Sequence, residues 1–247
     1  GNYVQKFRRD FMVSDLQEAV DSVGPAKVAQ AEAKAIRELK RDVEATLLSG
    51  NDRKAETGAQ PYKLRGLKQW LSADNSDVPT EYNTPSGSRS TSGAAITETD
   101  FNAIIQSIYR ENGEANNLTL VADTKLRQQL ADYARFVGQA NNLGTPANAD
   151  GIRRVSTDMG STTIKLSIEI YQSDFGTVSI VNMNPDTAPD TGAQDHGYLL
   201  NPAYYGVHEL IPMGSSRLPN LGGGERGFVD CALTLGVYAP QAHGIIT

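Results

Sequence analysis

Asp190, Thr191 and Gly192 form the tripeptide that carries the catalytic aspartate of aspartic proteases, enzymes in which two aspartates share one proton. In those proteases an apolar strand runs directly into the aspartate, whereas Ala188 and Pro189 precede it here, in a segment rich in Asp and Pro. The sequence holds no second copy of the tripeptide, so only a dimeric protease could use it. We interpret the segment as a surface turn, with a protease of this type as an alternative.

Other groups that bind ions or phosphates in proteins lack the required spacing. Gly222, Gly223 and Gly224 precede Arg226, but neither a phosphate-loop lysine nor a dinucleotide fingerprint accompanies them, so we expect a turn between strands. The loop aspartates do not have the spacing of a calcium loop, and the histidines do not have that of a zinc site (Asp186, Asp190 and Asp195; His196, His208 and His243). The sequence therefore predicts no catalytic residue, no metal site and no cofactor, that is, a protein that is not an enzyme.

Composition narrows the class of protein. The chain has 247 residues, a formal net charge of −6, and no apolar run near the roughly 18 residues of a membrane span, so we expect no membrane partner. The single cysteine, Cys231, predicts a buried thiol in a reducing compartment. The net charge argues against a general nucleic-acid binder. The charge is uneven, however, since residues 1–70 hold 13 Lys and Arg against 10 Asp and Glu, and the remainder holds 10 against 19. Because the sequence begins at Gly1 without a methionine, we expect a further piece upstream.

A long helix is predicted from Pro25 to Leu48, since proline suits a first helical turn and Gly50 suits a left-handed stop. Apolar residues recur along it at steps of three or four: Val28, Ala31, Ala35, Leu39, Val43 and Leu47. Such a narrow stripe indicates a helix of about 36 Å that lies across a sheet or a neighbouring element.

Further elements follow the same rules. Residues 2–14 read as an extended segment, residues 64–72 as a short helical turn, and Thr97 with Asp100 as a capping box for a helix that ends at Gly113. A buried strand at residues 117–123 leads to a helix that Asp123 caps, with an inner face of Leu126, Leu130, Tyr133 and Val137. Ile164, Leu166, Ile168 and Ile170 alternate with polar residues, which predicts a half-buried strand that turns at SDFG into a hairpin. A last strand is expected at FVDCALTLGVYAP, and the fold class is α+β.

The order of these elements resembles the major capsid protein of tailed double-stranded DNA bacteriophages, with the HK97-like capsid fold. An extended N-x-x-Q-x-F segment (Asn2, Gln5, Phe7) leads into a helix with E-L-K-R-D-x-E (Glu38 to Glu44), as in that family. The stretches YQSDFG, LNPAYY and FVDCALTLGVYAPQAHGII are also similar.

The resemblance implies a shell subunit built around a long spine helix. It implies that residues 1–24 are the returning limb of an extended loop, 25–96 the spine helix and peripheral domain, 97–160 the axial α/β domain, and 161–247 a hairpin and return strands of the peripheral β-sheet. Expected partners are copies of the chain in hexamers and pentamers, packaged double-stranded DNA in unspecific contact, and cement and portal proteins. The expected location is the virion capsid, assembled in the cytoplasm of the host bacterium, and an encapsulin-type compartment shell is the alternative.

Residues 2–14 are the candidates for contact between subunits. They carry aromatic groups that need a sheet to pack on, either their own or a neighbour's. The predicted contact residues are Tyr3, Phe7, Arg8, Arg9 and Phe11.

Overall fold

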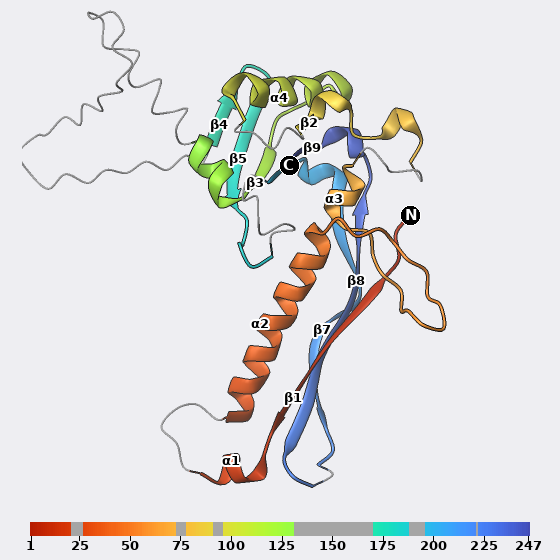
Figure 1. Cartoon of the computed structure of the whole chain (residues 1–247), viewed down its shortest axis with the longest axis vertical. Helices are drawn as coiled ribbons and strands as arrows, with labels where there is room; N and C mark the ends of the chain where they lie inside the picture. The colour runs from red at the N-terminus through yellow and green to blue at the C-terminus, as the bar shows by residue number, and fades with distance from the viewer. Residues whose placement is uncertain (21–26, 73–77, 91–95, 131–169, 188–195, 221) are drawn as a thin grey trace, which may run out of the picture. The chain divides into compact units, whose positions relative to one another are not determined.

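The computed structural model describes residues 1–20, 27–72, 78–90, 96–130, 170–187, 196–220 and 222–247 (Figure 1). The chain forms two compact units. Unit 1 comprises Gly1–Thr84, Asn184–Thr191 and Pro202–Pro240, and unit 2 comprises Pro85–Met183, Gly192–Asn201 and Gln241–Thr247. Both contain helix and sheet, so the predicted α+β class is confirmed.

Unit 1 is a three-stranded antiparallel sheet with a long helix along one face (Figure 1). The sheet order is β1 (Gln5–Val13), β8 (Glu225–Val237) and β7 (Tyr205–Leu218), so β8 is the central strand. The helices are α1 (Asp15–Ala19), α2 (Lys27–Leu48) and α3 (Leu67–Trp70), with short 3-10 turns at Thr80–Tyr82 and Pro202–Tyr204. Strands place alternate residues on opposite faces, and odd-numbered positions of β1 and β8 supply the apolar residues that pack with α2.

The predicted stripe of α2 is confirmed. Val28, Ala35 and Leu39 are buried, and Leu39 is only 1% exposed where it packs on the sheet. The predicted start at Pro25 lies outside the described residues. The predicted left-handed stop at Gly50 is wrong, because that residue does not have a positive φ. The helix is closed by Ser49, whose hydroxyl donates to the Thr46 carbonyl over 2.7 Å.

Unit 2 is built on a six-stranded mixed sheet. Its order is β2 (Arg89–Ser90), β9 (Gly244–Ile246), β6 (Gly197–Leu200), β3 (Leu118–Ala122), β5 (Gly176–Asn182) and β4 (Ile170–Ser173). The helix α4 (Glu98–Asn112) packs Phe101 and Ile105, both fully buried, into the same core as β3 and β5. Short 3-10 turns at Ser86–Ser88 and Pro240–Ala242 connect these elements.

The predicted ends of α4 are confirmed. Thr97 and Asp100 form the reciprocal capping box, and Gly113 ends the helix with φ 74°. Residues 124–130 are helical behind Asp123, and Leu126 and Leu130 are buried as expected. Tyr133 and Val137 lie outside the described residues.

The hairpin differs from the prediction in two respects. The strands β4 and β5 do form a hairpin around Asp174 and Phe175, but β5 pairs with β3, so the hairpin extends the six-stranded sheet and not the sheet of β7 and β8. Ile170 is 67% exposed, because Tyr171 points inward in its place and donates a 3.0 Å hydrogen bond to Asn102. Residues 162–169, the other part of the predicted strand, lie outside the described residues.

Candidate intersubunit surface

The N-terminal segment is attached to its own subunit by the three residues of the N-x-x-Q-x-F motif. The side-chain amide of Asn2 donates to the carbonyls of Arg65 (3.1 Å) and Leu235 (2.9 Å) and accepts from the Arg65 backbone N–H (2.7 Å). The side-chain amide oxygen Oε1 of Gln5 accepts a hydrogen bond from the backbone N–H of Leu64 (3.0 Å). Two polar side chains thus fix the start of β1 through backbone groups, which leaves no choice of register.

Phe7, the third residue of the motif, lies in the core of unit 1. It is 8% exposed and packs in a cluster with Leu39 of α2 and with Val229, Cys231 and Leu233 of β8. The expectation that its ring contacts a neighbour is therefore at odds with its position, because little of the ring is free.

The ring of Phe11 is half-buried against the same cluster as Phe7. It lies directly over Gly227 on β8, where an added Cβ would stand 2.6 Å from its Cζ. The glycine thus leaves room for a ring that shields the sheet.

Tyr3, Arg8 and Arg9, the other predicted contact residues, keep part of their surface open. Tyr3 packs its ring 5.4 Å from that of Tyr62. Arg8 lies on the face away from α2, with its guanidinium 4.3 Å from the Phe228 ring centre. These contacts position the side chains without covering them.

Arg9 lies on the face of β1 that α2 covers, and its side chain bridges β1 to α2. Its guanidinium lies 2.6 Å from a Glu38 carboxylate oxygen and 3.8 Å from one of Asp42. Because these groups are partly exposed, the pairs contribute at most about 1 kcal/mol each to stability. The E-L-K-R-D-x-E motif therefore supplies the acids that receive Arg9, while its leucine, Leu39, enters the core.

The other edge of the sheet, β7, is the surface that the sequence analysis missed. None of its fourteen residues is buried, and Leu210 is 71% exposed at an irregularity in its pairing with β8. The other large non-aromatic apolar side chains exposed in the described part of unit 1 belong to β1, α1 and β7, or follow them: Met12, Leu16, Val20, Val207, Ile211 and Leu218. An edge strand with free backbone groups and exposed apolar side chains readily pairs with another chain. Pro212 was the available signal, since proline within a strand is confined to edges.

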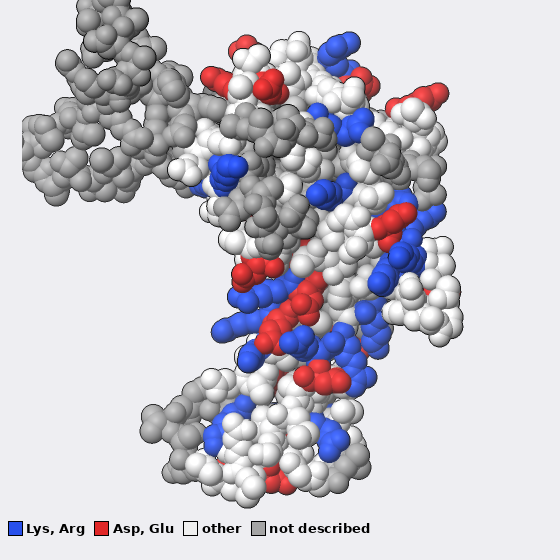
Figure 2. Space-filling view, viewed as in Figure 1, with Lys and Arg blue, Asp and Glu red and all other residues white. Residues whose placement is uncertain are grey.

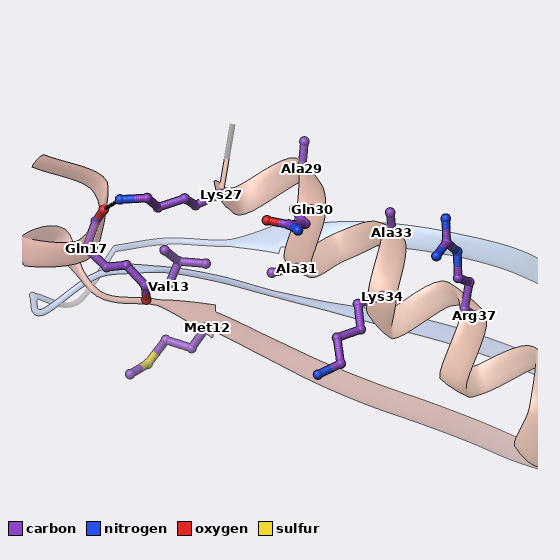
Figure 3. Close-up of a pocket in the computed structure, with 10 residues that line it drawn as sticks. All are labelled: Met12, Val13, Gln17, Lys27, Ala29, Gln30, Ala31, Ala33, Lys34 and Arg37. Carbon is purple, nitrogen blue, oxygen red and sulfur yellow. Dashed lines mark hydrogen bonds between the residues drawn. The ribbon is translucent and has the colours of Figure 1, made fainter. Parts of the chain in front are cut away.

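An open hollow of about 700 Å³ lies between α1, the end of β1 and the first turns of α2 (Figure 3). Met12, Gln17, Lys27, Ala29 and Lys34 are among the residues that line it. The ten lining residues offer amide, ammonium and guanidinium groups but neither a carboxylate nor a thiol.

The other candidate groups of the sequence lie apart from one another. His208 is hydrogen-bonded to Tyr238 in unit 1, whereas His243 in unit 2 accepts a 3.1 Å hydrogen bond from the Asn201 backbone. Asp186 pairs with Arg41 at 3.4 Å, and Asp190 and Asp195 lie outside the described residues. Within the described ranges, no three His, Cys, Asp or Glu side chains are grouped as metal ligands.

Two further expectations concern the glycine turn and the thiol. Gly222, Gly223 and Gly224 form the expected turn between β7 and β8, each with a positive φ. Cys231 is buried as predicted, and desolvation, together with the charges of Glu209 and Asp230, raises the pKa of its thiol. No helix in the described part of the chain combines the length and the apolar character needed to cross a bilayer.

A family model described as the SU10 major capsid protein matches residues 1–247, the whole chain. The chain belongs to the SU10 major capsid protein family. It is therefore a structural protein of a capsid shell, and the resemblance to phage capsid proteins is confirmed. No curated protein matches this SU10-family chain.

Solved shell structures share the fold of this SU10-family protein at low sequence identity. The capsid of cyanophage P-SCSP1u is 15% identical with a TM-score of 0.53, over 99% of this chain and 72% of that chain. Mycobacterium phage Patience is 12% identical with a TM-score of 0.55, over 100% and 69%. The SrpI encapsulin of Synechococcus elongatus PCC 7942 is 12% identical with a TM-score of 0.57, over 98% and 73%. The HK97-like fold is thus confirmed, and it is common to phage capsids and encapsulins.

Proposed function

We propose that this capsid protein self-assembles, as hexamers and pentamers, into an icosahedral shell around a phage genome. The single observation that carries the proposal is the position of β7 at the edge of the unit 1 sheet, where a strand of fourteen residues has no buried member and exposes apolar side chains such as Leu210. A lone soluble subunit would gain nothing from such an edge, whereas a lattice of copies buries it. The assembly takes place in the host cytoplasm.

The division into two units supports an assignment of domains. We infer that unit 1, with α2 as its spine, is the peripheral domain and that unit 2 is the axial domain at the centre of each capsomer. The β4–β5 hairpin then belongs to the axial domain, because it pairs with β3. In this assignment Tyr3, Arg8 and Arg9 remain contact residues, while Phe7 and Phe11 act by keeping β1 on its own sheet.

The test is to change the β7 edge without changing the subunit core. Leu210→Asp places a charge where 71% of the side chain is exposed, so the folded subunit should retain its circular dichroism spectrum. Burying that charge between copies is costly, and we expect sedimentation and negative-stain microscopy to show loss of closed shells. Tyr82→Asp changes a tyrosine that is 52% exposed on a turn outside the sheet and should assemble normally. Normal shells from Leu210→Asp would show that the edge is not a contact between copies.

A shell with a different content is the alternative, because encapsulins share the fold. Family membership favours the capsid, and the content of purified particles tests it: duplex DNA supports a virion shell, and protein cargo supports a compartment. Neither role requires catalysis by the chain. We place cement and portal proteins among its partners on the strength of the capsid role alone.

A further inference from the structure

Acidic and basic residues of α2 lie mainly on different sides of the helix. Its acids flank the buried stripe: Glu38 and Asp42 turn toward Arg9 of β1, and a Glu32 carboxylate oxygen accepts a hydrogen bond from the Ser215 hydroxyl of β7. These three carboxylates are used within unit 1. They hold the helix on the sheet from both sides.

Arg37 of α2 points the other way, away from β1, whereas the side chain of Lys34 reaches toward the β1 side, where it meets Glu38 (Figure 3). At about 100° per residue, Arg37 stands opposite the buried residues Val28, Ala35 and Leu39, and three more cations lie within about 60° of it: Lys34, Lys40 and Arg41. Figure 2 shows Lys and Arg side chains projecting from the α2 side of unit 1 beside a band of Asp and Glu. Glu44 is the one acid that the helical periodicity places on this half.

The uncharged residues between these cations are small. Ala29 and Ala33 lie on the same side as Arg37, pointing away from β1 (Figure 3). The cationic ends therefore stand above the surface around them. The contacts that Lys34 and Arg41 make, with Glu38 at 3.9 Å and Asp186 at 3.4 Å, are exposed and easily exchanged for other anions.

We propose that this outer face of α2 binds the phosphate backbone of duplex DNA inside the shell. The proposal rests on the proposed function, since it requires a shell that encloses DNA. Lys34 to Arg41 span about 10 Å along the helix, and duplex DNA carries one negative charge per about 1.7 Å of its axis, so several phosphates lie within reach.

The chemistry of the face favours DNA over another protein. Contacts between proteins depend on apolar or aromatic anchors, and between Ala29 and Glu44 the outer face of α2 offers only Ala29 and Ala33 besides polar and charged groups. Binding to the phosphates of DNA, in contrast, requires only positively charged side chains. The face also has no aromatic side chain that could stack on a base, so binding is independent of DNA sequence. With four exposed cations on a chain of net charge −6, it is weak enough for a genome to slide.

The test is the salt dependence of DNA binding by the dissociated full-length subunit. Fluorescence anisotropy with a labelled 30-base-pair duplex gives the binding constant at several salt concentrations, and a plot of its logarithm against the logarithm of the salt concentration should have a slope no steeper than about −3.6 for four phosphate contacts. Arg37→Gln with Lys40→Gln should make this slope shallower by about 1.8. Lys6→Gln with Arg8→Gln removes the same charge from β1 and should leave the slope unchanged. Arg37→Lys with Lys40→Arg keeps the charge and should bind as the wild type does.

Two results would overturn the proposal. Equal slopes for the wild type and the α2 variant would remove α2 from DNA contact, and an equal loss in the β1 variant would show general attraction only. If the α2 variant keeps its slope but forms no shells, the cations contact acidic surfaces of a second copy instead. If the wild type forms no shells while the α2 variant still loses slope, the proposed function is refuted, and with it the placement of this contact inside a shell; only DNA binding by the outer face of α2 would stand.

Discussion

Replacing Phe7 by alanine tests whether β1 is fixed to its own subunit. The ring is 8% exposed and lies among Leu39, Val229, Cys231 and Leu233, so its removal leaves a cavity between α2 and the sheet. Core Phe→Ala changes cost about 3–5 kcal/mol, and we expect about 3 here because β1 is an edge strand that can relax. With an m-value of about 3 kcal/mol per molar urea, the unfolding midpoint should fall by about 1 M.

The assay is urea unfolding of the dissociated subunit, followed by circular dichroism, with shell formation measured by sedimentation. Met12→Ala is the matched control, because that side chain is on the same strand but 63% exposed and should cost less than about 0.5 kcal/mol. Phe7→Leu should recover most of the loss. If Phe7→Ala kept the wild-type midpoint but formed no shells, the ring would have to contact a neighbouring subunit, and the assignment to the core would be refuted.

Three further outcomes are expected. Thr97→Ala removes the reciprocal cap of α4 and should lower the free energy of unfolding by about 1 kcal/mol, whereas Thr99→Ala, exposed two residues later, should not. Burial, with Glu209 and Asp230 nearby, raises the pKa of the Cys231 thiol, so iodoacetamide should label it only in urea. Because the unfolded chain releases this proton first, stability should decline as pH rises above about 8.5, and Cys231→Ala should remove that decline. Asp190→Ala should leave assembly and any particle-associated proteolysis unchanged, and loss of a processing step would support the protease alternative.

Local signals in the sequence predicted local structure well. Thr97, Asp100 and Gly113 set the ends of α4 through groups at most four residues away, so their effect can be deduced without the fold. The apolar stripe of α2 also predicted correctly which side meets a sheet. The end of α2 was predicted wrongly, because the helix ends with the Ser49 hydroxyl bound to the Thr46 carbonyl and not with a left-handed Gly50.

The other predictions that failed concern residues whose contacts are distant in the sequence. The N-x-x-Q-x-F residues were recognised, but Asn2 binds Leu235 and Phe7 packs on Cys231, and nothing near the N-terminus reveals those neighbours. The segment therefore looked unpartnered when it is a strand of its own subunit. Ile170 was assigned to the inside by alternation alone, and the Asn102 amide that draws Tyr171 inward comes from a distant helix.

The pairing of β1 with β8 also determines when a newly made chain can fold. Gln5 is paired with Leu233, and in unit 2 Ser90 is paired with Ile246. During translation the ribosome must pass residue 237 before the sheet of unit 1 is complete and residue 246 before the sheet of unit 2 is complete, so every shorter nascent chain lacks part of a strand in at least one unit. Contacts so distant in sequence also form slowly. The subunit therefore completes both of its sheets only after synthesis has passed this point.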